Sequence, residues 1–440
     1  MGSFLAMVAV ALMQLSLTPA AAEEPVGGWR AAWLTAMQQP NANPNWSQQG
    51  FAAESVRQVV RLSAGGPKVR IRISNQYGER PLRLTGATVA RAAQGAAVEP
   101  GSVRTVRFGG AETISVPIGS QIASDAVNLP TATAGDAAAV PAATATASAR
   151  ASAAAAASPT AAATGSGGVR LAITLYFADS TGAATFHEYG AAGASYRATG
   201  DARDDTSGAA YGEVGGSWYF LAGVDVSGVG AGSVVAFGDS TTNGFRTKPG
   251  LRYPDLLAAR LTAAGRPMPV LNAGLGGGRL LNDSDCFGES GLARFHRDVL
   301  DQPGVKTAVV LLGINDIGYP ELPATPCLTP NPEITAEQLI DGYRTLIRDA
   351  HARGIRVVGV TIPPFRGADV HTERSERLWA AVNTWIRTTE EYDAVADFAA
   401  ALADPADPTR LAPQYDSGDH VHPNEAGYRA MAEAIDITTL

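Results

Sequence analysis

The chain has 440 residues, of which 45% are hydrophobic and 17% charged, so it is long enough to form two domains that each bury a core. Its formal net charge of −8 at pH 7 argues against nucleic acid or an anionic membrane surface as the main partner. No stretch after residue 22 reaches membrane-spanning length without charged residues, so no integral membrane segment is expected.

Residues 1–22 have the pattern of a secretory signal peptide. An apolar run at residues 4–12 is followed by Ala20-Ala21-Ala22, which offers the small residues of a cleavage site, although no Lys or Arg precedes the run. A buried N-terminal helix or a membrane anchor is the alternative, but the run is too short to span a bilayer comfortably. We expect cleavage near Ala22 and a secreted or periplasmic protein.

Residues 23–229 have the pattern of an all-β domain. Polar and apolar residues alternate at 68–75 and 169–177 and, less strictly, at 55–62, and Gly, Pro and Asn bound these segments. Such alternation predicts strands with one buried and one solvated face, and several of them predict a sandwich or jelly roll. An Ala-, Thr- and Ser-rich insertion at about 130–168 has no aromatic residue, so we expect it to be disordered rather than an Ala-rich helix.

From residue 230 to residue 440 the pattern changes to alternating strands and helices. Continuous apolar runs, typical of strands buried on both faces, occur at 234–237, 269–272, 307–312 and 356–362. A helix is predicted to begin at Thr335, which forms a capping box with Gln338, and to end at a Gly354 C-cap. This order predicts an α/β domain with a parallel sheet covered by helices on both faces, and residues 228–232 form the boundary.

The segments that follow these strands carry polar residues suited to acyl transfer. They are Gly238-Asp239-Ser240, the glycine-rich residues 272–278, Gly313-Ile314-Asn315-Asp316, and residues 416–423 near the C-terminus. A serine nucleophile needs a base, and the base needs an orienting carboxylate. Ser240, His422 and Asp419 fit these roles, and the Ser240 N–H, a glycine N–H of the second segment and the Asn315 amide could stabilise an oxyanion.

Each of these motifs is weak by itself, since Gly-Asp-Ser is usually only a turn and Gly-Gly-Gly usually a flexible loop. The ordered set is what favours a catalytic site. His420 competes for the role of base, because on an extended segment it would project to the same side as His422. Of the other histidines, we expect His187 to be structural, at the domain interface, and His351 to lie on a helix surface; no partner is evident for His296 or His371.

Together the four segments resemble the SGNH hydrolases, also called the GDSL esterase/lipase family. Thr241 stands where that family's four-letter motif has Leu, and the oxyanion glycine is assigned to Gly277, with Gly274 or Gly276 as alternatives. The resemblance implies a three-layer α/β/α fold around a short parallel sheet, with His422 as the base and no cofactor. The preceding β-domain resembles that of exported bacterial members.

Only two cysteines occur, Cys286 and Cys327. Both lie in polar loop sequence, so a disulfide is favoured slightly over two unrelated thiols. Two cysteines without clustered histidines do not form a zinc site, and no metal is expected.

The expected function is therefore serine-dependent hydrolysis of a carboxylic ester through an acyl-serine intermediate, on a small-molecule or glycan ester. One alternative is a carbohydrate O-acetylesterase whose β-domain binds polysaccharide. Another is a glycan-binding surface protein with a vestigial hydrolase domain. Asp239 and Asp316, which flank the site residues, are expected to hold their loops by hydrogen bonds.

Overall fold

The computed structural model describes residues 28–131, 168–188, 194–228, 230 and 232–440. The predicted signal peptide and nearly all of the predicted insertion lie outside these ranges. No helix within the described ranges is both long enough and apolar enough to cross a membrane.

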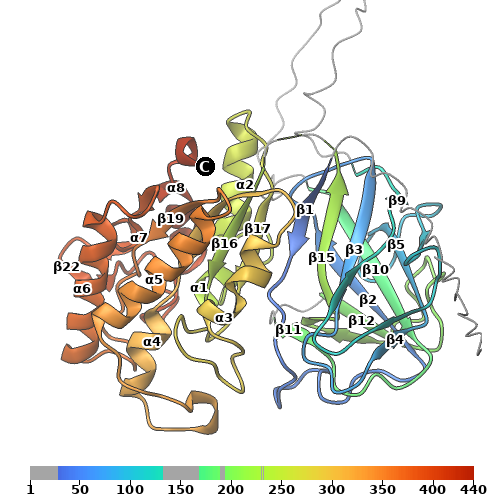
Figure 1. Cartoon of the computed structure of the whole chain (residues 1–440), viewed down its shortest axis with the longest axis horizontal. Helices are drawn as coiled ribbons and strands as arrows, with labels where there is room; N and C mark the ends of the chain where they lie inside the picture. The colour runs from blue at the N-terminus through green and yellow to red at the C-terminus, as the bar shows by residue number, and fades with distance from the viewer. Residues whose placement is uncertain (1–27, 132–167, 189–193, 229, 231) are drawn as a thin grey trace, which may run out of the picture.

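The N-terminal part of the chain is built from two antiparallel sheets packed face to face (Figure 1). One sheet has the order β1-β15-β3-β8, with β9 also pairing with β3, and the other has the order β13-β12-β2-β10-β5-β6. Their bounds are β1 Trp29–Leu34, β2 Glu54–Arg61, β3 Lys68–Ser74, β5 Gly86–Arg91, β6 Arg104–Val106, β8 Gln121–Ala123, β9 Val127–Asn128, β10 Arg170–Phe177, β12 Ser195–Thr199, β13 Glu213–Gly215 and β15 Leu221–Ser227. Two small sheets, β4 (Leu82–Leu84) with β7 (Ile114–Val116) and β11 (Phe186–Glu188) with β14 (Ser217–Tyr219), complete this β-domain.

The expectation of one solvated face is wrong for β2. Alternate residues of β2, such as Val56 and Val60, point into the core between the sheets, but Arg57 and Val59, which point to the opposite face, are buried as well. The Arg57 guanidinium donates to Thr174 Oγ1 and to the carbonyls of Ala96 and Asp205 at 2.7–2.9 Å. Loops therefore cover the outer face of this sheet, and hydrogen bonds satisfy the polar groups beneath them.

The C-terminal part contains a five-stranded parallel sheet of order β17-β16-β18-β19-β20. The strands are β16 Ser233–Gly238, β17 Val270–Gly274, β18 Val305–Leu311, β19 Arg356–Val360 and β20 Ala394–Ala396. Val235 and Phe237 point to one face of this sheet, and Val234 and Ala236 point to the other. Both faces are apolar because helices cover both, as the continuous apolar runs predicted.

The helices of this α/β domain form the two outer layers. Residues of α3, α5 and α6 pack on the face of Phe237, and residues of α2, α7 and α8 pack on the other face. The bounds are α1 Ser240–Asn243, α2 Tyr253–Ala263, α3 Gly291–Phe295, α4 Ile314–Gly318, α5 Ala336–His351, α6 Glu373–Thr388, α7 Phe398–Leu402 and α8 Glu425–Ala434; β21 (Ala403–Asp404) and β22 (Asp407–Leu411) pair beside α7. Thr335 and Gln338 form the predicted capping box of α5, whereas the C-cap is Ala352 rather than Gly354. Gly354, at φ +67°, turns the chain toward β19.

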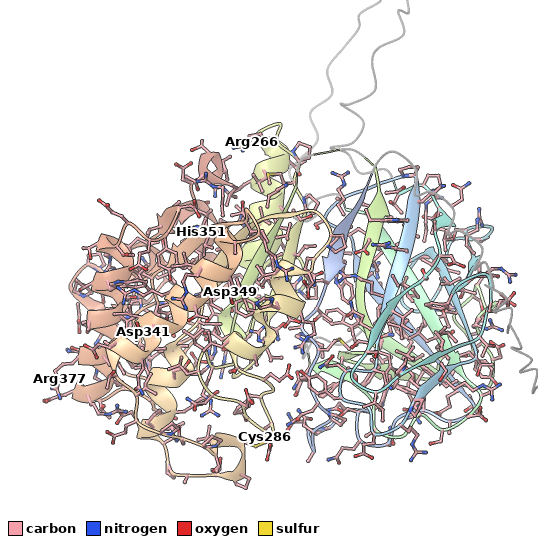
Figure 2. All side chains as sticks on the ribbon, in the orientation of Figure 1. Arg266, Cys286, Asp341, Asp349, His351 and Arg377 are labelled. Atoms are coloured by element: carbon pink, nitrogen blue, oxygen red, sulfur yellow. A yellow bond between two sulfur atoms is a disulfide. The ribbon has the colours of Figure 1, made fainter. Side chains whose placement is uncertain are left out.

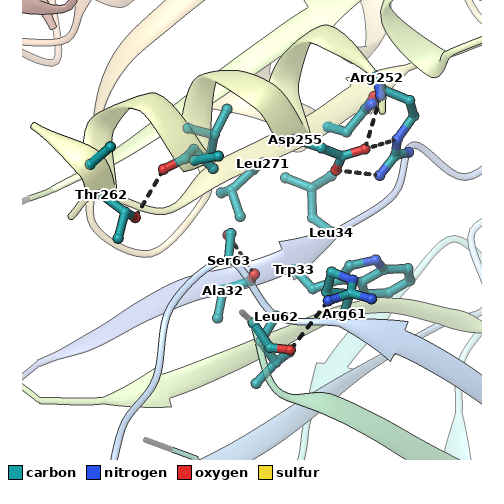
Figure 3. Close-up of a pocket in the computed structure, with 16 residues that line it drawn as sticks. Ala32, Trp33, Leu34, Arg61, Leu62, Ser63, Arg252, Asp255, Thr262 and Leu271 are labelled. Carbon is teal, nitrogen blue, oxygen red and sulfur yellow. Dashed lines mark hydrogen bonds and ion pairs between the residues drawn. The ribbon is translucent and has the colours of Figure 1, made fainter. Parts of the chain in front are cut away.

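The two domains lie side by side, with β1 at the interface (Figure 1). The Ala31 N–H donates to the Pro303 carbonyl at 2.9 Å, and Ala31 and Leu34 belong to the α/β core. A cavity of about 260 Å³ remains between β1, the loop after β2, and α2 with β17 (Figure 3). None of the predicted catalytic residues lines it.

Candidate active site

The predicted nucleophile is the first residue of a helix that starts directly after the central strand. Gly238 ends β16, and a side chain there would collide with Thr242 and with the Leu311 carbonyl. Asp239 caps α1 by accepting the Thr241 N–H at 2.9 Å, which confirms its expected loop-holding role. Burial raises the pKa of Asp239 to about 6. Ser240 thus stands at the carboxyl edge of the sheet, in the first helical turn, where an N–H has no acceptor within the helix.

Ser240, His422 and Asp419 form a continuous hydrogen-bonded chain. Ser240 Oγ lies 2.8 Å from His422 Nε2, and His422 Nδ1 lies 2.9 Å from Asp419 Oδ2. Burial alone would raise the pKa of the Asp419 carboxyl, but hydrogen bonds from the His422 side chain and backbone hold it well below its usual range. An ionised Asp419 favours the tautomer of His422 that carries its proton on Nδ1, and this tautomer presents the lone pair of Nε2 to Ser240 Oγ.

His420, the competing base, has a different partner. Its Nδ1 lies 2.6 Å from Asp416 Oδ2, and its side chain is half exposed. The segment is not extended at this point, because His420 has a left-handed backbone with φ +64°. The expectation that His420 and His422 would project to the same side is therefore wrong, and only His422 contacts Ser240.

Gly277 and Asn315, the two predicted oxyanion donors other than Ser240, line the same pocket as Ser240 and His422. Gly277 has φ +72°, and a Cβ there would lie 2.4 Å from the Phe287 ring, so the position requires glycine. Within the described part of the chain, no acceptor is seen for the Gly277 N–H. Asn315 Nδ2 donates one hydrogen to the Gly278 carbonyl at 2.9 Å, which leaves its second hydrogen for a ligand.

Buried polar groups fix the loops around these donors. Asp316 accepts the N–H groups of Leu280 and Leu281 at 2.7 and 2.9 Å, and burial raises its pKa to about 6. Arg294, which is fully buried, donates to the carbonyls of Gly238 and Ala273 and thereby joins the ends of β16 and β17. The role of Asp316 was expected, whereas nothing in the sequence indicated Arg294.

Two residues just after α1 also contact the predicted catalytic residues, although nothing in the sequence indicated them. The Phe245 ring packs against the His422 imidazole with centroids 4.5 Å apart. Arg246 Nε lies 3.0 Å from Asp419 Oδ2, the oxygen that also binds His422. One short segment therefore packs on the predicted base and pairs with the predicted orienting carboxylate.

The β-domain forms part of the same pocket, which has a volume of about 440 Å³. Gln38, Asn43 and Glu188 line it together with Ser240 and the other site residues. Next to Glu188, the buried His187 binds the Ala36 carbonyl at 2.6 Å and the Asn243 side chain at 3.0 Å. His187 thus lies at the domain interface, as expected, and contacts the last residue of the nucleophile helix.

The two cysteines form a disulfide, Cys286–Cys327. Cys286 lines the pocket, and its loop is also bound from the β-domain, since Gln39 Nε2 donates to the Asp285 carbonyl at 2.5 Å. Figure 2 marks Cys286 in this loop. The disulfide therefore closes a loop that forms part of the site wall.

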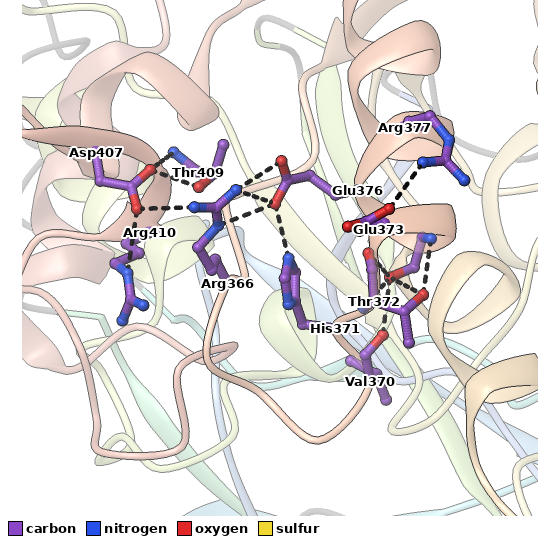
Figure 4. Close-up of polar contacts among 11 residues, drawn as sticks. Arg366, Val370, His371, Thr372, Glu373, Glu376, Arg377, Asp407, Thr409 and Arg410 are labelled. Carbon is purple, nitrogen blue, oxygen red and sulfur yellow. Dashed lines mark hydrogen bonds and ion pairs between the residues drawn. The ribbon is translucent and has the colours of Figure 1, made fainter.

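The remaining histidines are paired with carboxylates away from Ser240. His371 binds Glu376, which also binds Arg366 (Figure 4). His296 lies 3.2 Å from Asp349, and His351, on the exposed side of α5, lies 2.9 Å from Asp393. His296 and His371 therefore have partners that the sequence did not indicate. Across the described ranges, no cluster of three or more His, Cys, Asp or Glu side chains could hold a metal ion.

A parallel sheet with helices on both faces and a Ser-His-Asp chain at its carboxyl edge is an arrangement suited to ester hydrolysis. Residues 236–430 match the model of the GDSL-like Lipase/Acylhydrolase family. The C-terminal domain belongs to this family, as the four sequence segments predicted, and the chain is a carboxylic ester hydrolase.

Three solved structures that are similar to the chain each cover just under half of it. A lipolytic protein of the G-D-S-L family from Desulfitobacterium hafniense is 21% identical, with 46% of this chain and 96% of that chain covered and a TM-score of 0.35. An alpha/beta hydrolase from the metagenome of Lake Arreo is 22% identical (47% and 94% covered, TM-score 0.36). An acetyl xylan esterase from Geobacillus stearothermophilus is 19% identical (47% and 94% covered, TM-score 0.36). No curated protein matches the chain.

Proposed function

We propose that the chain hydrolyses carboxylic esters through an acyl-serine intermediate on Ser240. The observation that carries this proposal is the hydrogen-bonded chain from Ser240 Oγ to His422 Nε2 (2.8 Å) and from His422 Nδ1 to Asp419 (2.9 Å). All three side chains are in place without rearrangement, so the nucleophile can lose its proton as it attacks.

In the first half of the reaction, His422 Nε2 takes the Ser240 proton while Oγ bonds to the ester carbonyl carbon. The carbonyl oxygen becomes an oxyanion, which the N–H groups of Ser240 and Gly277 and the Asn315 amide stabilise. The tetrahedral intermediate then expels the alcohol, which receives the proton from His422, and the acyl group stays on Ser240.

In the second half, His422 takes a proton from water, and the resulting hydroxyl attacks the acyl carbon. The second tetrahedral intermediate expels Ser240 Oγ, which regains its proton from His422, and a carboxylic acid leaves. Asp419 stays ionised throughout and stabilises the imidazolium at each step.

Two further features support the proposal. A vestigial site would be expected to have lost a member of the set, whereas nucleophile, base, carboxylate and oxyanion donors are all present. The disulfide near the site fits the proposed export to an oxidising compartment, which follows from the leader at residues 1–22.

The variant Ser240→Ala tests the assignment of the nucleophile. It is expected to abolish hydrolysis of p-nitrophenyl acetate and to leave thermal unfolding unchanged, because the substitution removes only one oxygen. Ser207→Ala, at an exposed position of the β-domain, is the matched control and is expected to keep full activity. Full activity in Ser240→Ala would overturn the proposal.

A further inference from the structure

The β-domain supplies one wall of the catalytic pocket. Three of its residues, Gln38, Asn43 and Glu188, line the pocket beside Ser240. Glu188 is the last residue of β11, which lies on the side of the β-domain that faces the α/β domain (Figure 1). A substrate bound at Ser240 therefore meets side chains of both domains.

Hydrogen bonds fix Glu188 from three directions. The Nδ2 groups of Asn41 and Asn43 both donate to its Oε2 atom, at 3.1 and 2.8 Å. Its backbone N–H donates to Gln38 Oε1 at 3.1 Å, and its carbonyl accepts from Asn243 Nδ2 at 3.2 Å. Because Asn243 ends the helix that begins at Ser240, Glu188 is held at a set place relative to the nucleophile.

The carboxylate keeps capacity to accept more hydrogen bonds. Within the described ranges, both amide donors go to Oε2, and none of the hydrogen bonds seen there reaches Oε1. No Lys or Arg is among the residues that line the pocket. A carboxylate that lines the pocket and can accept further hydrogen bonds suits a ligand that brings hydrogen-bond donors of its own.

The rest of the lining is largely apolar. Phe245, Phe287, Ile314, Tyr319 and Val370 supply aromatic and aliphatic surface. Hydrocarbon of the acyl group fits such a surface, whereas the acceptors of Glu188 and Asn43 fit the polar part of an ester. For a carboxylic ester with a hydrocarbon acyl group, that polar part is the alcohol.

We propose that Glu188 determines specificity for the alcohol part of the substrate, and that this part is a polyhydroxylated, sugar-like group whose hydroxyls donate to the Glu188 carboxylate. The inference rests on the proposed function of Ser240 and assigns the β-domain a direct part in substrate recognition. A quaternary ammonium group has no hydrogen to donate to the oxygen acceptors of Glu188 and Asn43, but charge and the aromatic lining would attract it, so acetylcholine is the competing substrate in the test.

Glu188→Gln tests the proposal with three acetate esters that share one acyl group. The first is methyl 6-O-acetylglucopyranoside, the second is tetrahydropyranylmethyl acetate, whose ring lacks hydroxyls, and the third is acetylcholine. Gln can still accept from Asn41 and Asn43, but it presents an N–H₂ donor where the carboxylate presented an acceptor.

The wild type is expected to prefer the glucoside by tenfold or more in kcat/KM over either other ester. Glu188→Gln should lower kcat/KM for the glucoside by about ten- to a hundredfold, mainly through KM, and leave the hydroxyl-free ester within about twofold.

Two further variants complete the experiment. Glu213→Gln, at an exposed carboxylate of β13, is expected to leave kcat/KM unchanged for all three esters. Asn43→Ala removes one donor to Glu188 from an exposed position, and it should shift selectivity in the same direction by a smaller factor even if Glu188→Gln does not fold.

Several results would overturn the proposal. An equal loss of kcat/KM in Glu188→Gln on the glucoside and on the hydroxyl-free ester would mean that Glu188 acts on the helix of Ser240 through Asn243. A wild type with no preference for the glucoside, or with a preference for acetylcholine, would also contradict the proposal. Failure of the proposed function looks different, because the wild type would then hydrolyse none of the three esters or p-nitrophenyl acetate.

Discussion

The substitution Asp419→Asn tests how the structure prepares His422 as a base. Asp419 Oδ1 accepts the backbone N–H groups of Val421 and His422 at 3.1 and 2.8 Å, so an asparagine would keep its oxygen there. Its Nδ2 would then face His422 Nδ1, 2.9 Å away in the native protein, and Arg246 Nε, 3.0 Å away. Because an amide N–H₂ can only donate, the imidazole would have to accept at Nδ1 and carry its proton on Nε2.

That tautomer cannot take the proton of Ser240. In serine hydrolases, the corresponding loss of the correct tautomer lowers kcat by about 10⁴ while the geometry stays intact. At about 1.4 kcal/mol per tenfold, this raises the activation barrier by roughly 5 kcal/mol. KM should change much less, because Asp419 is not among the residues that line the pocket.

The assay is steady-state hydrolysis of p-nitrophenyl acetate, together with thermal unfolding to show that the variant is folded. The matched control is Asp416→Asn, which makes the same change in the neighbouring pair of Asp416 and His420, 2.6 Å apart and away from Ser240. The control should retain activity within about threefold. If Asp419→Asn also stays within tenfold of the wild type, Asp419 does not orient the base.

Three other predictions concern the oxyanion site, the disulfide and a buried carboxyl. Asn315→Ala should lower kcat by about 10²–10³ with little change in KM, because it removes a donor to the oxyanion; steady-state kinetics measures this. The double variant Cys286→Ser/Cys327→Ser should lose about 4 kcal/mol of unfolding free energy in urea, since the disulfide closes a loop of sequence separation 41. For Asp316, burial raises the folded-state pKa to about 6 from an ordinary value of 3.8, so the folded protein binds more protons than the unfolded chain between these values. The unfolding free energy of the wild type minus that of Asp316→Asn should therefore fall by roughly 1 kcal/mol per pH unit from about pH 4 to pH 6 and level off above.

Each of these predictions has a contradicting result. Unchanged kcat in Asn315→Ala would remove this side chain from the oxyanion site. An unfolding free energy that does not change when both cysteines are replaced would show that the loop is held by its other contacts. A difference between the wild type and Asp316→Asn that does not vary with pH would mean that Asp316 ionises in the folded state as it does in the unfolded chain.

Local sequence patterns predicted most of the fold of the α/β domain. The apolar runs predicted strands buried on both faces, and Val234 and Val235 indeed point to opposite, helix-covered faces. The capping box of Thr335 and Gln338 located the start of α5, because that signal depends only on residues three apart. The acylhydrolase family of this domain could be identified for the same reason, since each of its motifs is a short segment after a strand or near the C-terminus.

Local sequence patterns could not predict contacts between segments that are far apart in the chain. Arg57 lies in a segment of alternating polar and apolar residues and was expected on a solvated face. Loops more than 35 residues away in sequence cover it instead. Nothing in the sequence near Arg294 or Arg246 reveals that one joins two strand ends and the other pairs with Asp419. Glu188 lies in the β-domain, and only the docking of the two domains brings it to the pocket of Ser240.

Trapping the acyl group and locating it in the chain tests whether Ser240 is the nucleophile. The protein is mixed with p-nitrophenyl acetate, quenched in acid within milliseconds, digested and analysed by mass spectrometry, with Ser240→Ala treated in parallel. We expect one acetyl group, on the peptide that contains Ser240, appearing in a burst with p-nitrophenol and absent from the variant. Acetylation at another residue, or equal acetylation of Ser240→Ala, would contradict the assignment of Ser240 as the nucleophile.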